Sequence, residues 1–410
     1  MSKGKVILFG LAACMLYGIG AGLRSDIGIL LQPIAAQTGL TYARVSFCIA
    51  AMQLVFGIAQ PLFGILAARR SNRFVLILGS ALIIGGLLGI RASYSFVPLF
   101  LSLSLVFALG VGAVAFGLVY SSAVYFVGAS NAMLISGMLN AAAGMIGFIF
   151  SPMINALIES GGLSRALLVV SLIAVLLIPI TFLVTARDPK RGAAGNVDGA
   201  DRESPERIRP GALAREAWHN RTYRLLIAGF STCGFHMVII ESHLFSQFKS
   251  YGIPGESASW AFSVYGIATI VGALLSGWMS ARFDKGKLLT FYYGFRAIWV
   301  AIYLFLLPKN FGTALLFSIG LGMTGDATVS PTSGLVNREF SIQKVATLVG
   351  FLFLCHQIGA FLSSWLGGIL VEATGGYVAI WGIDIAVCVF ACVMSGMISH
   401  RRNRDEAIHC

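Results

Sequence analysis

Nine ionisable side chains lie in stretches of this sequence that are otherwise apolar, and they are its candidates for chemistry. They are Arg24, Asp26, His236, Glu241, His243, Arg296, Asp326, His356 and Asp384. At the centre of a lipid bilayer a charge costs about 2.5–3.5 kcal/mol on insertion scales, so each such group needs a partner or a function. An arginine in this setting can bind an anion, and a histidine or a carboxylate can carry a proton.

Arg24 is the first candidate for binding an anion. Glycines at positions 18, 20, 22 and 28 leave room beside its planar guanidinium, which can bind a carboxylate through two parallel hydrogen bonds. The alternative is a structural ion pair with an acidic residue of another helix, for which Asp326 is the candidate. Asp26 is a weaker partner, because residues two apart point to different faces of a helix.

The stretch from His236 to Gln247 holds the densest polar set. His236 and His243 are seven residues apart, so they share one helical face, with Gln247 one further turn along. We expect His236 and Glu241 to take part in proton coupling and His243 to bind substrate; a neutral ring bonded to a neighbouring helix is the alternative for either histidine. Glu241 lies about 140° around the helix from His236, which argues against a metal site.

The remaining candidates divide by their surroundings. Asp326 lies among glycines that permit close helix approach, and it is a candidate proton site or partner of an arginine. Tyr120 and Asn140 are candidates to donate a hydrogen bond to a carboxylate. Arg296 and Asp384 are expected to be structural, with Arg296 in an ion pair with an acidic neighbour.

Membrane-spanning helices must position these residues. Hydrophobic residues make up 57% of the chain and charged residues 11%, whereas soluble domains average about 25% charged residues. Twelve apolar stretches are each long enough to cross about 30 Å of hydrocarbon. They cover residues 6–35, 45–67, 74–92, 97–126, 133–158, 165–186, 222–248, 257–281, 287–307, 311–336, 345–371 and 377–399.

The sequence also repeats itself at an offset of 213 residues. The matching pairs are Gly39 and Gly252, Gly64 and Gly277, Arg69 and Arg282, Gly137 and Gly350, and Glu159 and Glu372. The repeat predicts an all-α membrane protein whose twelve transmembrane helices form two six-helix bundles related by a pseudo-twofold axis. We expect bundles at residues 1–186 and 222–410 and a cytoplasmic linker at 187–221, with a short amphipathic helix near residues 212–220. A solute site then belongs between the bundles.

The net charge of +12 does not indicate nucleic-acid binding, because the charges are placed as in a membrane protein. Most Lys and Arg residues fall on the side of the predicted linker and the two termini. The positive-inside rule assigns that side to the cytoplasm. We therefore expect a multi-pass protein of the inner (plasma) membrane, with both termini cytoplasmic and membrane lipid around it.

The loop after the second predicted helix resembles the signature of the major facilitator superfamily, a pattern close to G-x-L-A-D-R-x-G-R-K. The chain reads GILAARRSNR from Gly64 and GWMSAR from Gly277. The resemblance implies gating roles for Gly64, Arg69, Arg73, Gly277 and Arg282. The aspartate of the pattern is replaced by Ala68 and Ala281, so a latch that uses it must be weaker or built differently here.

Three stretches are similar to the bacterial branch of the monocarboxylate porters. They are GAGLRSDIGILLQPI, CGFHMVIIESHL and GFLFLCHQIGAFLSSWLGG. The helix 8 arginine of the animal carriers has no counterpart here, because GIATIVGALLSG holds no charge. In the related oxalate–formate exchangers, helix 11 carries a cationic substrate residue, so the resemblance implies that His356 binds substrate; a helix-packing hydrogen bond is the alternative.

These observations predict a secondary transporter that moves a small organic anion, most simply a monocarboxylate, by alternating access with proton coupling. An exporter of a larger amphipathic metabolite or drug is the alternative within transport, and a non-transporting membrane sensor is another. No nucleotide-binding G-x4-GK[ST] loop is present. No enzymatic residue constellation, cofactor, metal or obligate protein partner is expected.

Overall fold

A computed structural model describes residues 3–128, 131–186 and 210–408, and every regular element in these ranges is a helix. The first half contains α1 (Lys3–Ser25), η1 (Ile27–Leu30), α2 (Leu31–Thr38), α3 (Tyr42–Arg69), α4 (Asn72–Arg91), α5 (Phe96–Leu99), η2 (Phe100–Phe107), α6 (Ala108–Ala113), α7 (Phe116–Val127), α8 (Ala132–Val175) and α9 (Leu177–Val184). The second half contains α10 (Pro210–His219), α11 (Arg221–Ile239), η4 (Ile240–Leu244), α12 (Phe245–Ser250), α13 (Gly255–Ser280), α14 (Lys285–Phe305), α15 (Phe311–Thr324), η5 (Asp326–Thr328), α16 (Val329–Glu339), α17 (Ile342–Thr374) and α18 (Val378–Ile408).

Ten helical segments in the described ranges are long and apolar enough to cross a membrane. One of them, Leu134–Val184, is interrupted at Gly162, whose φ of 73° is not helical, so it supplies two helices. The predicted span 311–336 is present but broken, because α15 ends at Thr324 and α16 begins at Val329. With these two corrections, each of the twelve predicted spans has a helical counterpart.

The backbone carries the same repeat as the sequence. Among the described residues, only five glycines have positive φ, and four of them form two pairs 213 residues apart. Gly39 (φ 68°) corresponds to Gly252 (φ 79°), and Gly162 (φ 73°) corresponds to Gly375 (φ 70°). A side chain is disfavoured at such angles, so these turns require glycine in both halves.

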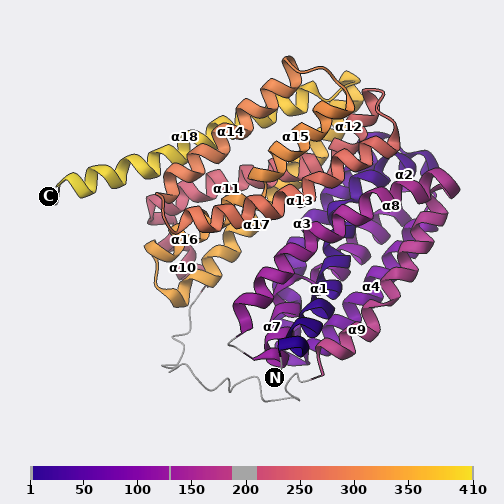
Figure 1. Ribbon diagram of the computed structural model, residues 1–410, viewed down its shortest axis with the longest axis horizontal. Coiled ribbons are helices and arrows are strands. Elements are labelled where there is room, and N and C mark those ends of the chain that lie inside the picture. Colours follow the sequence, from indigo (N-terminus) through magenta and orange to yellow (C-terminus); the bar gives the residue numbers. More distant parts are fainter. Residues whose placement is uncertain (1–2, 129–130, 187–209, 409–410) are drawn as a thin grey trace.

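The two halves form two bundles that lie side by side (Figure 1). They meet along α3 and α17, along α8 and α13, and where η1 contacts η4. We call the end that carries Lys3, Ala186 and Pro210 the linker end, and the opposite end, at Gly39 and Gly375, the far end.

The interbundle hydrogen bonds between described residues run from the middle of the molecule to the far end, as in Ser364 Oγ to Ser46 O (3.1 Å) and Ala43 N to Glu372 Oε2 (2.9 Å). Toward the linker end, Gly64, Gly137 and Gly350 have no other atom within 4 Å of an added Cβ position. The bundles are therefore closed against each other at the far end and separated at the linker end.

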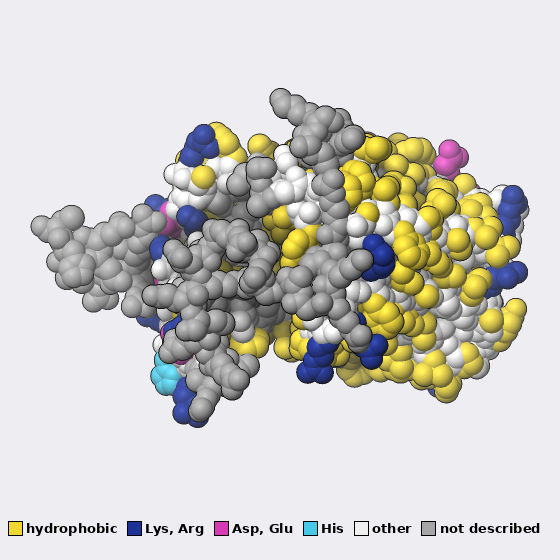
Figure 2. Space-filling model, turned by 90° about the horizontal axis from the view of Figure 1, so that it is seen from below, with side chains coloured by type: hydrophobic (Ala, Val, Ile, Leu, Met, Phe, Trp, Pro, Cys, Tyr) yellow, Lys and Arg dark blue, Asp and Glu magenta, His cyan; other side chains and the backbone are white. Residues whose placement is uncertain are grey.

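The outer surface suits a lipid environment. Figure 2 shows hydrophobic side chains spread over the visible face of the first-half bundle, with Lys and Arg side chains toward its ends. Large apolar side chains such as Leu168, Leu172 and Leu176 are exposed there. In a membrane these apolar faces contact hydrocarbon, which avoids the free-energy cost of exposing them to water.

The predicted linker falls mostly outside the described residues, since only 210–221 of it is described. The short helix expected near 212–220 is present as α10. Its Leu213 and Ala217 are buried in the apolar core of the second-half bundle. Glu216 forms an ion pair with Lys344 at the start of α17 at 2.8 Å, so α10 is fixed to that bundle.

The contact between α8 and α13 depends on glycine at two facing positions. A Cβ atom at Gly144 would lie 2.5 Å from the Gly266 carbonyl oxygen, and one at Gly266 would lie 2.7 Å from the Gly144 carbonyl oxygen. We expect Gly144→Val to force the bundles apart and to destabilise the fold by about 1–3 kcal/mol, the usual cost of overpacking. The measurement is the melting temperature of the purified protein. Gly137→Val on the same helix, which faces open space, is the matched control; equal melting temperatures would contradict the tight contact.

Candidate functional site

A buried ion pair joins the two bundles at the middle of the molecule. Arg24, in the last turn of α1, donates from Nη1 to Glu241 Oε2 at 2.8 Å and from Nη2 to Glu241 Oε1 at 3.2 Å. Gln53 of α3 accepts from Arg24 Nη1 at 2.8 Å and donates from Nε2 to Glu241 Oε2 at 3.0 Å. The guanidinium thus binds a carboxylate by the paired geometry expected of it, and the carboxylate belongs to the protein.

The surroundings of this pair leave the arginine more accessible than its partner. The Arg24 side chain is 20% exposed and that of Glu241 is 5% exposed. The guanidinium carbon lies 4.9 Å from the centre of the Phe56 ring, close enough for a cation–π contact. An incoming anion can therefore approach Arg24 without first unpacking Glu241.

The position of Glu241 depends on a local departure from α-helical geometry. It lies in η4, a π-helical turn between α11 and α12, and such wider turns recur at functional sites. Gly28 of η1 packs directly against the carbonyl oxygens of Glu241 and Ser242, where a Cβ atom would collide with them. Positions 28 and 241 are equivalent in the 213-residue repeat, so the ion pair lies at the pseudo-twofold axis.

Asp326 was the acidic partner expected for Arg24 if that arginine were structural, but Glu241 occupies that place. The difference arises because η4 carries Glu241 across to α1, whereas Asp326 lies at the break between α15 and α16. Asp326 is half-buried and within electrostatic range of Arg24, Glu241 and His356. In the described part of the chain its carboxylate has no hydrogen bond or ion pair.

His356 of α17 is also half-buried. Its Nδ1 lies 3.0 Å from Oε1 of Gln357, and its ring lies 5.2 Å from that of Phe230. Gln357 in turn donates to the backbone oxygen of Gln53 at 2.8 Å. His356 is therefore one residue away from the polar network around Arg24.

His243 lies in the closure of the far end. Its Nε2 must donate to the Ser364 carbonyl oxygen at 3.1 Å, so Nδ1 accepts from the Tyr42 hydroxyl at 2.8 Å. The Tyr42 hydroxyl also lies 3.3 Å from that of Tyr377. Because Tyr42 belongs to one bundle and the other three residues to its partner, this cluster holds the far end shut, and His243 does not contact Arg24.

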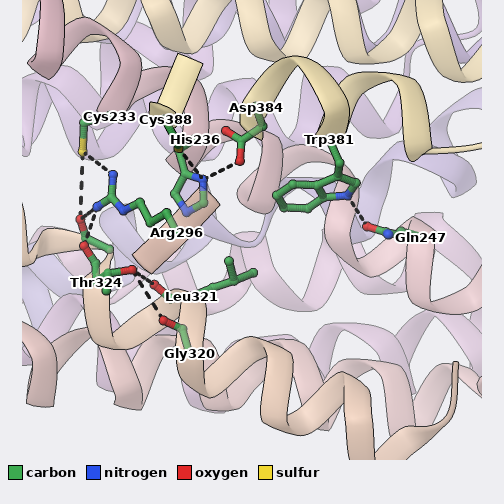
Figure 3. A network of polar contacts seen from close by, with 11 residues as sticks. Cys233, His236, Gln247, Arg296, Gly320, Leu321, Thr324, Trp381, Asp384 and Cys388 are labelled. Atoms are coloured by element: carbon green, nitrogen blue, oxygen red, sulfur yellow. Dashed lines mark hydrogen bonds and ion pairs between the residues drawn. The ribbon is translucent and has the colours of Figure 1, made fainter. Parts of the chain in front are cut away.

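His236 lies inside the second-half bundle, fully buried. Its Nδ1 is 2.8 Å from Oδ2 of Asp384 and 3.9 Å from Sγ of Cys388 (Figure 3). The donor atoms of these three residues lie within 4.8 Å of one another, which is close enough to hold a metal ion. The short histidine–carboxylate hydrogen bond already uses Nδ1, however, and gives Asp384 the structural role expected for it.

Arg296 was expected to pair with an acidic neighbour, and in the described region it does not. Figure 3 shows its guanidinium at the end of α15, where Nη2 donates to the carbonyl oxygens of Thr324 and Gly325, the latter at 2.8 Å. Nη1 donates to Cys233 Sγ at 3.4 Å. The broken helix leaves carbonyl groups unpaired at its negative end, and these take the place of a carboxylate.

The other sequence candidates lie apart from the Arg24 network. Tyr120 stacks on Phe116, with ring centres 5.5 Å apart, and Asn140 donates to the Ser136 carbonyl oxygen at 2.9 Å. At the linker end, Arg73 bonds Thr185 of its own bundle, and Arg282 packs over Trp278. Gly64, Gly277 and Arg69 show no contact between the bundles in the described ranges. Gating roles for this set stay a prediction, which concerns a conformation closed at the linker end.

The partners Tyr42, Gln357 and Tyr377 were not identified from the sequence. They are uncharged, and in an apolar helix such residues are common without any function. The pairing of Arg24 with Glu241 did have a usable signal. Positions 28 and 241 coincide under the repeat, and equivalent positions of a twofold pair meet at the axis.

Comparisons with known proteins agree with this architecture. The family model of the Major Facilitator Superfamily matches residues 8–254 and 244–407. An uncharacterised MFS-type transporter of Bacillus subtilis, YcxA, is 29% identical over 189 residues, 44% of this chain and only 43% of that protein. Human monocarboxylate transporter 12 is 23% identical over 87% of this chain and 72% of its own length.

Solved structures show the same fold. A bacterial homologue of the human lysosomal transporter Spinster, in an inward-facing and unoccupied conformation, superposes with a TM-score of 0.73 at 16% identity and 98% coverage of both chains. A point mutant of the nucleoside transporter NupG superposes with a TM-score of 0.75 at 15% identity, covering 95% of this chain and 99% of that one.

The ion pair at the axis predicts that its two charges are energetically linked. We expect Arg24→Met to destabilise the protein by about 3–5 kcal/mol, because Glu241 is left buried without its cation. Adding Glu241→Gln should restore most of the melting temperature. Arg44→Met, at an exposed arginine of α3, is the control. A double variant no more stable than Arg24→Met would show that the pair is not what Arg24 stabilises.

The far-end cluster predicts a measurable opening. Tyr42→Phe removes a hydrogen bond worth about 1 kcal/mol, which corresponds to a factor of about five in the closed-to-open ratio. The readout is the rate of thiol labelling at Ser46→Cys, because Ser46 is buried where the two bundles meet. The labelling of the protein without this cysteine is subtracted as background. Tyr94→Phe, at an exposed tyrosine, should leave labelling unchanged. Unchanged labelling in Tyr42→Phe would remove this bond from the closure.

Proposed function

Because the chain belongs to the Major Facilitator Superfamily, a family of transporters and not of enzymes, we propose that it is a secondary transporter of a small organic anion, most simply a monocarboxylate. The observation that supports this proposal is the Arg24–Glu241 pair. A guanidinium that binds a protein carboxylate through two hydrogen bonds, between the bundles and partly exposed, is suited to bind the carboxylate of a solute in the same way.

The pair also provides a reason for proton coupling. When a substrate carboxylate takes the place of Glu241 on Arg24, Glu241 loses its cation while it stays buried. A buried carboxylate without a partner costs several kcal/mol, so a proton on Glu241 lowers the cost of the loaded state. Substrate and proton then bind together, and the exchange of partners at Arg24 couples their movements.

The two ends of the molecule fit alternating access. Because most Lys and Arg lie at the linker end, we assign that end and both termini to the cytoplasm of a cell with this protein in its inner membrane. The observed separation of the bundles at the linker end is then an inward-open conformation. Arg24 and Asp326 are reached from the cytoplasm in this state, while the Tyr42–His243 cluster closes the other side.

The name of one relative supports the substrate class. Monocarboxylate transporter 12 aligns over most of this chain, although at 23% identity it supports a class of solute and not a particular one. An exporter of a larger amphipathic solute predicts a different result in the same assay, since transport would then not require a carboxylate.

The test is uptake of radiolabelled acetate, propionate, lactate and pyruvate into proteoliposomes with and without an imposed proton gradient. We expect a proton gradient to drive uptake of at least one of them in the wild type. Glu241→Gln should keep solute exchange but lose the response to the gradient, because its neutral amide no longer gains or loses a proton. Comparing it with His236→Gln identifies the proton site, since only the residue on the proton route removes the response. Absence of both uptake and exchange of any carboxylate would contradict the proposal.

A further inference from the structure

The charges between the bundles are not balanced. Around the cation Arg24 lie the carboxylates Glu241 and Asp326, and His356 adds a charge only when protonated. A third carboxylate, Asp26, is within electrostatic range of Glu241 but is only 4% exposed in the first half. Arg24 and Glu241 neutralise each other through two hydrogen bonds. Asp326 is left as a half-buried carboxylate without a counter-charge of its own.

Arg296, the other arginine in the apolar helices of this bundle, does not provide that counter-charge. Its side chain is fully buried behind helix segment η5, and its Nη atoms are committed to Thr324 O, Gly325 O and Cys233 Sγ. The fully buried carboxylate of Asp384 lies in the same bundle and is hydrogen-bonded to His236. The surplus negative charge therefore stays on the face that a solute meets.

A second orphan polar group lies beside Asp326. The hydroxyl of Tyr265 is buried and has no hydrogen-bond partner among the described residues. It lies next to Gly325, where an added Cβ atom would be 3.3 Å from the hydroxyl oxygen. Gly325 directly precedes Asp326, so a carboxylate and an unsatisfied hydroxyl are presented together, which is the composition of a site for a hydrogen-bond donor with positive charge.

We propose that the substrate carries a cationic group, such as an ammonium, in addition to its carboxylate, and that Asp326 and the Tyr265 hydroxyl bind this group. The inference rests on the proposed function, since it takes the carboxylate to be on Arg24. With the carboxylate on Arg24, a proton on Glu241 and the ammonium on Asp326, the charges of these groups and the solute sum to zero. Neutrality favours passage through a closed state in a low-dielectric environment.

The experiment uses pairs of probes that differ only in the cationic group: propionate with β-alanine, butyrate with 4-aminobutyrate, and valerate with 5-aminovalerate. Affinities are measured by ligand-induced shifts of the melting temperature of the purified full-length protein, and uptake is measured in proteoliposomes. For at least one pair we expect the amino acid to bind at least about tenfold more tightly than its unsubstituted partner, the factor that about 1.4 kcal/mol provides.

Variants then assign the preference to residues. Asp326→Asn should abolish it, Asp326→Glu should keep part of it, and Tyr265→Phe should reduce it. Glu256→Gln, at an exposed carboxylate at the start of α13, should leave it unchanged. All variants are compared at equal concentrations of folded protein, and folding is judged by the melting temperature without ligand. If Asp326→Asn fails to fold, Asp326→Glu takes its place.

Two results would overturn this inference without touching the proposed function. In the first, both members of every pair bind equally and Asp326→Asn changes neither affinity, while Arg24→Lys still weakens both. In the second, plain monocarboxylates are transported and Asp326→Asn removes only the response to a proton gradient, which makes Asp326 a proton site. If Arg24→Lys changes no affinity for any carboxylate, the proposed function itself fails.

Discussion

The structure depends on one electrostatic constraint, a partly buried arginine whose charge must be met within an apolar helix bundle. Arg24 meets it with a carboxylate from the other bundle, so the same contact that neutralises the charge also holds the halves together. A pair buried within one bundle would be unaffected by relative movement. A pair across the interface makes the energy of that interface depend on what occupies the guanidinium.

The pseudo-twofold repeat gives the bundles similar backbones but different interfaces. On one side, Gly57 of α3 faces Gln357 of α17; on the other, Gly144 of α8 faces Gly266 and Ile270 of α13. Position 357 is the equivalent of 144, and position 270 is the equivalent of 57. At these equivalent positions, one interface therefore carries an amide hydrogen bond and the other carries close backbone contact. Two hydroxyl hydrogen bonds, from Ser151 to the Ser259 carbonyl oxygen and from Ser263 to that of Phe148, also cross the second interface, so movement at either interface changes hydrogen bonding.

Much of the fold was predictable, because hydrophobic length and an internal repeat are properties of the sequence itself. The spans, the two halves and the helix α10 follow from them. The site was predictable only in its members: Arg24, Glu241, Asp326 and His356 stand out because charge is costly in apolar helices. Their partners were not, since the π-helical turn at Ile240–Leu244 and the break at Gly325 change which faces meet. Arg296 shows the limit most clearly, because backbone carbonyls replaced the acidic side chain that a charge count would look for.

The π-helical turn has a mechanical meaning beyond placing a carboxylate. Glu241 and His243 are two residues apart on this turn, and one holds the central arginine while the other closes the far end. A rotation of the turn that releases Glu241 must also move the His243 imidazole, which is hydrogen-bonded to Tyr42 and to the Ser364 carbonyl oxygen. In the proposed mechanism, a solute that displaces Glu241 from Arg24 would therefore also act on the far-end closure through a single turn of backbone, without a long chain of intermediate residues.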